Sequence, residues 1–429
     1  MLLVYTQKVT PRITYSFKFI CVQVLGIPVR FTSRIEDFVA HEGMKISYGK
    51  ASLANELFIQ NVDLLLEQGV SDLEIKIQDW NGVPCFFPVS EESALPCDIF
   101  AAAFFLLSRY EEYLPHVKDE QGRFRASESL AQNNGFLQVP VVDIWALRFR
   151  DLLKRHFTDF DFPERKYTAT SVVSVTEAYC YRKKGILRIL LGLLKDIFSF
   201  RPKYVLHRFQ VMFRFRRDPY DIYGKLIRIL KKHGLSIKFM FQVSDFSTYD
   251  RNTNHNRLEF QSLMKSVADY AEVGLQPGYY AIRSAQILKD EKTRLESILK
   301  RPVRSGLNKK YNLMLPDAYM NMVELDFQFD YSMGYPDALG FRAGTCTPFL
   351  FYDINFEITT PLLLYPYCIS TKALDNLKET EAEYKVRELK RQVKVVEGTM
   401  VYVFTNKDLS EYANSKRNLG ILKSLHEVD

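Results

Sequence analysis

The sequence lacks closely spaced cysteines. Its six cysteines are scattered, and no two have the Cys-X-X-Cys spacing of a zinc knuckle or a redox pair. A scattered set also argues against a disulfide framework and favours a reducing compartment. The first 19 residues carry Lys8, Arg12 and Lys18 within their apolar stretch, so a signal peptide is not expected. These absences predict a cytoplasmic protein.

Long apolar runs are missing as well. The longest, residues 99–107, is far short of the roughly 20 residues that a membrane span needs. Hydrophobic residues make up 47% of the chain and charged residues 25%, which is typical of a globular protein. Because 429 residues exceed one compact core, two domains are expected.

The pattern of the chain predicts an α/β fold with a domain boundary near residue 163. In the N-terminal part "LLVYT" and "MKISYG" indicate strands, and "PCDIFAAAFFLLSRYEEYLPH" indicates a helix that Pro115 ends. The polar stretch 158–170 contains a proline and separates residues 1–163 from residues 164–429. Beyond it strands alternate with helices, which predicts parallel strands whose C-terminal ends carry the functional groups. The expected strands are 170–176, 236–243, 272–277 and 399–406.

Between the first two of these strands we expect a helix over residues 218–234. Asp218 is the expected N-cap residue, Pro219 lies in the first turn and Gly234 ends the helix.

Positive charge is concentrated in one segment, residues 182–217. The chain has a net charge of +7, but this segment holds 11 Lys or Arg and one acid, Asp196, so the rest of the chain is slightly acidic. A helix is expected over residues 186–196, since its apolar residues have helical spacing; these are Ile186, Ile189, Leu190, Leu193 and Leu194. The segment is either a surface insertion that packs its apolar face on the protein or a contact with an anionic membrane. Nucleic acid is not an expected partner because no known binding module is present.

Several stretches together resemble one known family. In the N-terminal half they are "LLVYTQKVTPRITYSFKFI", "CDIFAAAFFLLSRYEEYLPH", "DEQGRFRASESLA" and "PVVDIWA". In the C-terminal half they are "EAYCYRKKG", "RRDPYDIY", "EVGLQPGYYA", "DYSMGYPDALGFRAGTCTPFLFYD" and "TNKDLS". The chain thereby resembles polysaccharide-deacetylase proteins of Bacteroidetes type. The resemblance implies an N-terminal α/β domain followed by a distorted NodB-like (β/α) barrel.

The resemblance also implies a chemistry that this sequence departs from. Such deacetylases use one divalent metal, an Asp base, a second Asp and histidines as metal ligands, and a His acid. The matching positions hold no such groups: Ser174 and Thr176 replace the aspartates, Gln276 a metal-binding His, and Thr405 the acid His. None of the seven histidines lies between residues 256 and 425. We therefore expect no metal cofactor and a catalytically degenerate pseudoenzyme that binds a glycan or a partner in polysaccharide metabolism.

Four residues are candidates for ligand binding. Glu177 is either a relocated carboxylate or a solvated residue at a strand end. Asp330 and Arg342 resemble pocket-wall residues of the family and either bind a sugar or form a structural ion pair, and Tyr279 either stacks on a sugar or packs. One alternative function is therefore an active hydrolase with a site rearranged around Glu177, Asp330 and Arg342. Another is a peripheral membrane scaffold.

Two further features have structural explanations from the sequence. Cys346 in "GTC" has no histidine nearby in the sequence, so a buried thiol is expected rather than a nucleophile. Glu111 and Glu112 are adjacent on a predicted helix and do not face each other, so an acid–base pair is not expected.

Overall fold

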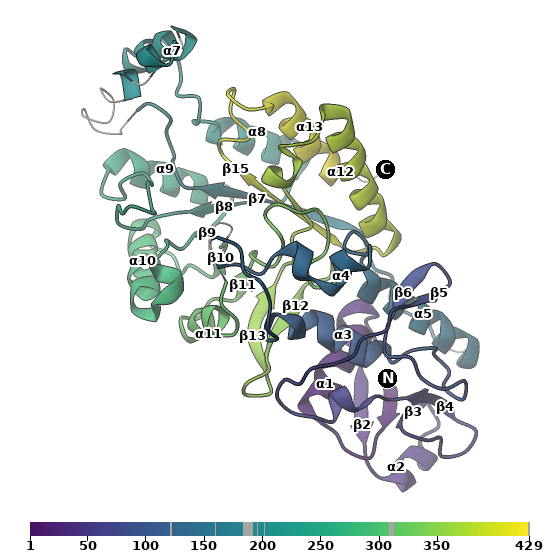
Figure 1. The fold of residues 1–429 in the computed structure, drawn as a ribbon. Helices are drawn as coiled ribbons and strands as arrows, with labels where there is room; N and C mark the ends of the chain where they lie inside the picture. Colours follow the sequence, from purple (N-terminus) through teal and green to yellow (C-terminus); the bar gives the residue numbers. More distant parts are fainter. Residues whose placement is uncertain are drawn as a thin grey trace. The chain divides into compact units, whose positions relative to one another are not determined.

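The computed structural model describes residues 1–120, 122–158, 160–182, 192–194, 196–200, 202–308 and 313–427 (Figure 1). They form two compact units. The first comprises Met1–Thr168, Tyr311–Asn376 and Thr380–Val401; the second comprises Ala169–Lys310, Leu377–Glu379 and Tyr402–Asp429. These spatial units each gather separate stretches of chain, and the sequence-domain boundary near residue 163 stays a prediction.

The first unit contains a four-stranded parallel sheet in the order β2-β1-β3-β4. The strands are β1 (Leu2–Tyr5), β2 (Val29–Thr32), β3 (Lys45–Gly49) and β4 (Leu57–Gln60). The strands expected at "LLVYT" and "MKISYG" are β1 and β3. Its main helices are α1 (Pro11–Phe17), α2 (Ile35–Ala40), α3 (Ile99–Leu107) and α5 (Val141–His156). Helix α3 is buried on every side, as its uniformly apolar sequence requires.

Helix α3 is shorter than the sequence predicted. It ends at Leu107 and not at Pro115, because Arg109 adopts a left-handed conformation with φ of 57°, which a right-handed helix cannot contain. The hydroxyl of Ser108 donates to the Phe104 carbonyl at 2.6 Å in the last turn. The short 3-10 helix η3 (Tyr110–Glu112) follows. The reversal at Arg109 lets two consecutive glutamates turn back toward its guanidinium.

The first unit also contains a smaller group of strands. Strands β12 (Phe349–Asp353) and β13 (Ile358–Leu364) are antiparallel, and β13 runs parallel to β11 (Phe329–Asp330). The remaining elements of this unit are η1 (Lys18–Val24), η2 (Asp63–Leu65), β5 (Gln78–Trp80), β6 (Val83–Cys85), η4 (Ala126–Glu128), α4 (Leu130–Asn133), α11 (Asp317–Glu324), β14 (Ile369–Ser370), η6 (Thr371–Leu374) and most of α12 (Glu379–Val395).

The second unit is built on a parallel run of strands. The order is β10-β9-β8-β7-β15, with β8 (Ile237–Phe241), β9 (Glu272–Leu275), β10 (Ser305–Gly306) and most of β7 (Thr168–Val175) and of β15 (Thr399–Thr405). Helices α8 (Tyr223–His233), α9 (Leu258–Ala268) and α10 (Ala285–Leu299) connect successive strands, and η5 (Ala281–Arg283), α7 (Pro202–Met212) and α13 (Ser415–His426) complete the unit. The predicted α/β class with parallel strands is confirmed. Among the described residues of this unit, hydrogen bonds do not close the strands into a ring.

The start of α8 differs from the prediction. Gly234 ends the helix with φ of 63°, as expected, but the helix begins at Tyr223. Asp218 is not the N-cap. Its carboxylate instead accepts the backbone N–H groups of Cys180, Tyr181 and Arg182 at 2.7, 2.9 and 3.0 Å, which fixes the loop after β7.

The helix predicted over residues 186–196 falls largely outside the described residues. Of the basic segment, α7 and its flanks are described. No described helix is both long enough and apolar enough to span a membrane.

Candidate functional site

A cluster of polar side chains lies where β7 and β9 end. Parallel strands place their C-terminal ends at one edge of a sheet, so residues far apart in sequence meet there. Ser174, in β7, donates a hydrogen bond to the amide oxygen of Gln276, which directly follows β9. The Gln276 amide nitrogen donates to the Thr176 hydroxyl at 3.0 Å. Ser174 and Gln276 are buried. The structure thus brings together three of the four positions at which the family resemblance implies catalytic groups.

Thr405, the fourth position, lies at the adjacent strand end but its hydroxyl is engaged elsewhere. The N–H of Asn406 donates to the Ser174 carbonyl at 3.1 Å, which places the end of β15 beside β7. The Thr405 hydroxyl accepts the N–H of Asp408 at 3.2 Å, and the Asp408 carboxylate accepts the N–H of Thr405 at 2.7 Å. Thr405 therefore closes a turn after β15, and no bond among the described residues joins its hydroxyl to Gln276.

Gln242 extends the cluster from the end of β8. Its amide nitrogen donates to the Ser244 hydroxyl at 3.0 Å and to the Asp250 carboxylate at 2.6 Å. Its amide oxygen lies 3.5 Å from the amide nitrogen of Gln276. The hydrogen bonds therefore continue from the strand ends to a buried carboxylate in the loop after β8.

Asp250 forms half of a buried carboxyl pair that the sequence did not predict. The backbone N–H of Tyr279 donates to Asp250 at 2.8 Å, and the N–H of Gly278 donates to Glu291 of α10 at 2.9 Å. Both carboxyl groups are 2% exposed. Burial and, to a lesser extent, the charge of Asp250 raise the pKa of Glu291 to about 7, although the hydrogen bond from the Gly278 N–H lowers it. Together the two carboxyl groups fix the backbone just beyond Gln276.

Glycine is required at the centre of this arrangement. A Cβ atom on Gly278 would lie 2.6 Å from the Cβ of Ser244, 2.8 Å from an oxygen of Glu291 and 3.0 Å from an oxygen of Asp250. The close approach of the two carboxyl groups to one backbone position therefore depends on the missing side chain.

Two tyrosines directly after this glycine, Tyr279 and Tyr280, form an aromatic surface with Tyr249 from the loop after β8. We call these three residues the tyrosine platform. The rings of Tyr249 and Tyr279 are stacked at 3.9 Å with an interplanar angle of 16°, and Tyr280 meets both edge-on. The Arg283 guanidinium lies 4.0 Å from the centre of the Tyr279 ring. Tyr249 and Tyr280 are each 48% exposed, whereas Tyr279 is half-buried. The platform thus presents aromatic surface close to the strand ends.

The carboxylate candidates are already partnered in the structure. Glu177, half-buried in the second unit, forms an ion pair with Lys407 at 2.8 Å. Asp330, in the first unit, is fully buried and accepts the hydroxyl and the N–H of Ser332 at 2.6 and 2.8 Å. Burial raises the pKa of Asp330 to about 6, although the hydrogen bonds from Ser332 lower it.

Arg342 belongs to a buried charge network within the first unit. Its guanidinium forms two hydrogen bonds with Glu112, at 2.9 and 2.6 Å, and Arg109 contacts Glu112 at 2.7 Å and Glu111 at 2.6 Å. Burial alone would raise the pKa of Glu112, but the charges of Arg342 and Arg109 outweigh it and lower this pKa to about 2. The two adjacent glutamates thus act together as acceptors for two arginines.

Cys346 is a buried thiol, as the sequence predicted. It is 1% exposed, and burial followed by the charge of Asp143 raises its pKa well above the ordinary value. A thiol in this state is a poor nucleophile.

The strand-end cluster does not fit the divalent metal that the family resemblance implies. Ser174, Thr176 and Gln276 supply two hydroxyls and an amide, and Gln242 adds a second amide. Such groups bind zinc weakly without a carboxylate or an imidazole. These groups are also bonded to one another: the amide oxygen of Gln276 accepts from Ser174, and its NH₂ group faces Thr176. In the part of the chain that the structure describes, no three His, Cys, Asp or Glu side chains gather as metal ligands would.

Comparison with known proteins gives two findings. Residues 2–158 match the model of a family of unknown function, DUF7033. The chain has no match among curated proteins.

Among solved structures, the chain is similar to a proposed polysaccharide deacetylase from Mycobacterium smegmatis, at 12% identity and a TM-score of 0.39, over 63% of this chain and 87% of that one. It is also similar to a CE4 family pseudoenzyme from Bacillus anthracis, at 10% identity and a TM-score of 0.32, over 61% and 63% of the two chains. A third is the polysaccharide deacetylase Bc1974 from Bacillus cereus, at 10% identity and a TM-score of 0.31, over 61% and 87%. Likeness at this level does not transfer an activity to this chain.

Proposed function

We propose that this protein is a catalytically degenerate, polysaccharide-deacetylase-like protein that binds a glycan. The observation that carries the proposal is the bonding of Ser174, Thr176 and Gln276 to one another at the strand ends. Neither hydroxyls nor amides act as bases near neutral pH, and these three leave no ligand set for an activating metal. The cluster therefore serves to fix the strand ends and the loops that follow them.

The tyrosine platform supports a glycan as the ligand. Aromatic rings offer apolar faces to the C–H groups of a sugar, and the hydroxyls and the nearby Arg283 guanidinium offer hydrogen bonds. The platform is held in place, because the N–H of Tyr279 is bonded to Asp250 and its ring is stacked on Tyr249. A rigid aromatic surface loses little conformational entropy when a ligand binds.

The alternative of an active hydrolase around Glu177, Asp330 and Arg342 has less support. A general base must reach the substrate proton. Asp330 is fully buried, Arg342 is held by Glu112, and Glu177 is paired with Lys407. Each of these charged groups is therefore already hydrogen-bonded or ion-paired within the protein.

Binding and turnover assays on the full chain test the proposal. We expect chitotetraose or acetylated xylan to bind, and no acetate to be released from either substrate with added Zn²⁺ or Co²⁺. Tyr249→Ala and Tyr280→Ala should each weaken binding several-fold. Tyr270→Ala is the matched control, since Tyr270 is also 48% exposed but lies at the end of α9. Metal-dependent acetate release would contradict the proposal that the protein is catalytically degenerate. Equal glycan binding by all three variants would contradict the proposal that the tyrosine platform binds the glycan.

A second candidate function, docking on an anionic membrane, is favoured by the described part of the basic segment. Ten exposed large hydrophobic side chains lie between residues 194 and 215: Leu194, Ile197, Phe198, Phe200, Tyr204, Leu206, Phe209, Met212, Phe213 and Phe215. Phe200 is 93% exposed and Phe215 84%. Soluble proteins seldom expose so many apolar side chains together unless the surface has a partner.

The attachment of α7 supports the same candidate. His207 bonds to the Tyr412 hydroxyl at 2.8 Å, and the Arg208 guanidinium lies 4.6 Å from the Tyr181 ring centre. Polar and aromatic contacts therefore attach the helix to its unit, while Phe209 of the helix and Phe213 and Phe215 after it remain exposed. Lys203 and Arg214 are exposed in the same segment. Aromatic residues mixed with cations are typical of helices that lie in a membrane interface.

Vesicle co-sedimentation tests this second candidate. We expect the full chain to bind phosphatidylserine-containing vesicles more than phosphatidylcholine vesicles, and binding to fall as salt is raised. The variant Phe213→Ser with Phe215→Ser should lose most binding. Phe246→Ser, at 59% exposure elsewhere in the same unit, is the control. Equal binding to both vesicle types at all salt concentrations would contradict an electrostatic contribution.

A further inference from the structure

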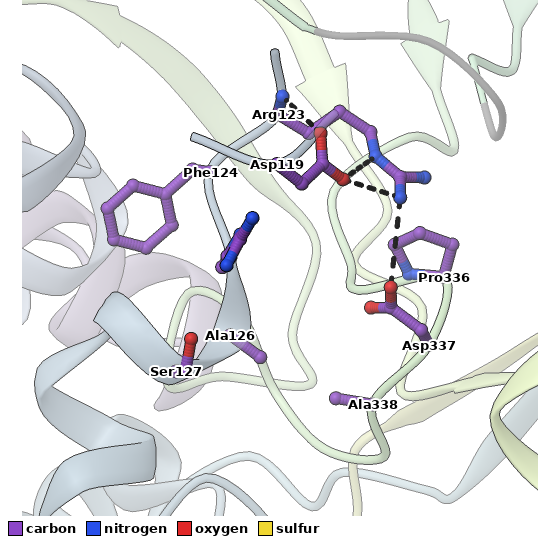
Figure 2. A pocket seen from close by; sticks show the side chains of 9 residues that line it. Asp119, Arg123, Phe124, Ala126, Ser127, Pro336, Asp337 and Ala338 are labelled. Carbon is purple, nitrogen blue, oxygen red and sulfur yellow. Dashed lines mark hydrogen bonds and ion pairs between the residues drawn. The ribbon is translucent and has the colours of Figure 1, made fainter. Parts of the chain in front are cut away.

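A cavity of about 260 Å³ lies within the first unit, and Figure 2 shows its lining. One wall comes from Asp119 and residues 123–127 and the other from residues 336–338. Both stretches belong to sequence motifs, "DEQGRFRASESLA" and "DYSMGYPDALGFRAGTC". Neither motif contributes a residue to the strand-end cluster of Ser174, Thr176, Gln242 and Gln276. The fold thus joins two otherwise unexplained motifs at one concave surface.

Arg123 connects the two walls. Its Nε donates to Asp119 at 2.6 Å, and the Asp119 carboxylate also accepts the N–H of Arg123 at 2.8 Å. On the other side, the guanidinium of Arg123 lies 3.7 Å from Asp337. Figure 2 shows these contacts along one edge of the cavity. One guanidinium is therefore hydrogen-bonded to Asp119 and lies within ion-pair distance of Asp337.

The ring of Phe124 packs against His116 and Arg109. It is only 7% exposed, its ring meets the His116 ring edge-on at 4.8 Å, and the Arg109 guanidinium lies 5.8 Å from its centre. Arg109 is itself held by Glu111 and Glu112. The buried charge network thus fixes the aromatic part of the lining.

From this lining we infer that the cavity binds one unit of a neutral sugar. Two carboxylates (Asp119, Asp337) and two guanidiniums (Arg123, Arg125) cancel in charge, so an anion or a cation would meet a like charge on one side. Carboxylates accept and guanidiniums donate, which suits neighbouring sugar hydroxyls.

The rest of the lining and its size agree with this ligand class. Phe124, Pro336 and Ala338 supply apolar surface for the C–H groups of a ring. A void of roughly 150 Å³ holds a benzene ring, so 260 Å³ is sufficient for one pyranose. This site lies in the first unit and does not depend on the proposed function of the strand-end cluster.

Binding of monosaccharides to the full chain tests the inference. Saturation-transfer NMR would be recorded with methyl glycosides of glucose, galactose, mannose and N-acetylglucosamine, and with inorganic phosphate as an anionic probe. We expect at least one pyranose to bind and phosphate not to compete. Arg125→Ala and Asp337→Asn should each weaken that pyranose about tenfold or more, because each removes one charged hydrogen-bonding partner. Both residues are exposed, so these variants should retain the fold, which circular dichroism checks.

Two controls separate this site from the others. Arg387→Ala removes an exposed arginine of α12 outside the cavity and should leave the affinity unchanged. Tyr270→Ala, in the second unit and outside the tyrosine platform, should also leave it unchanged. Arg125→Ala and Asp337→Asn change the cavity and leave the platform intact, so a failed prediction for this cavity is distinguishable from a failed prediction for the platform. The inference is overturned if none of the four glycosides binds, if phosphate displaces the bound one, or if Arg125→Ala and Asp337→Asn bind as wild type.

Discussion

The N–H of Gly278 donates to the carboxyl group of Glu291 at 2.9 Å, and this one bond joins α10 to the loop that follows β9. The neighbouring N–H, of Tyr279, is bonded to Asp250. Two buried acids thus bind two consecutive peptide groups and fix the loop that carries Tyr279 and Tyr280 of the tyrosine platform. The stability of this loop should therefore respond to pH.

Glu291→Gln should flatten the pH dependence of stability. Burial raises the pKa of Glu291 from 4.5 to about 7, so the folded state binds this proton more tightly than the unfolded chain. The free energy of unfolding of the wild type should then fall between pH 4.5 and 7, by about 3 kcal/mol at most. Urea unfolding at pH 5 and pH 8 measures the difference. The control is Asp290→Asn, an exposed acid on the same helix, which should keep the wild-type slope.

Gly278→Ala should destabilise the second unit by about 1–3 kcal/mol, because the new methyl group has no room beside Ser244 and Glu291. Gly224→Ala is the matched control: a Cβ there meets no atom within 4 Å, and alanine favours the helix in which it lies. Thermal unfolding followed by circular dichroism compares the two. A Gly278→Ala variant as stable as Gly224→Ala would show that the loop is not tightly packed.

Glu112→Gln should destabilise the first unit by about 3–5 kcal/mol. The change leaves the buried guanidiniums of Arg109 and Arg342 short of one negative charge, and an uncompensated buried charge is costly. Arg391→Ala breaks an ion pair with Glu388 on the surface of α12 and should leave the unfolding transition in place. Equal effects of the two variants in urea titrations would mean that the buried network adds nothing to stability.

Gln276→His should not create a zinc site. Among the described residues, the imidazole would have the hydroxyls of Ser174 and Thr176 and the amide oxygen of Gln242 beside it, and these groups bind zinc weakly. We expect less than one equivalent of Zn²⁺ to survive dialysis, for the variant as for the wild type. The same change combined with Ser174→Asp and Thr176→Asp supplies three ligands and should bind zinc. Stoichiometric zinc in the single variant would show that other donors lie within reach.

The strand-end cluster could be anticipated from the sequence, but its surroundings could not. Ser174 and Gln276 end strands that are recognisable from their apolar runs, and parallel strands bring such ends together. Asp250 and Glu291 lie in a loop and a helix, where acids are normally solvated, and only the close approach at Gly278 makes them a pair. The contact between Asp250, Glu291 and Gly278 is tertiary, so no local sequence pattern predicts it.

The first unit contains a second feature that could not be predicted from the sequence, the early end of α3. Glu111 and Glu112 looked like neighbours on a continuing helix, whose side chains point about 100° apart. The left-handed residue Arg109 ends that helix and brings both carboxylates to one guanidinium. An arginine in this conformation is uncommon, and its sequence gives no turn signal of the kind that glycine or asparagine would. The shorter helix was therefore not predictable from its apolar pattern.

The raised pKa of Glu291 also affects the heat of folding. Between pH 4.5 and 7 the folded state holds a proton that the unfolded chain has released, so folding takes a proton from the buffer. The calorimetric enthalpy of unfolding then includes the heat of protonating the buffer, and it differs between a phosphate and an imidazole solution at the same pH. Through one carboxyl group bonded to Gly278, the choice of buffer thereby changes the measured enthalpy of unfolding.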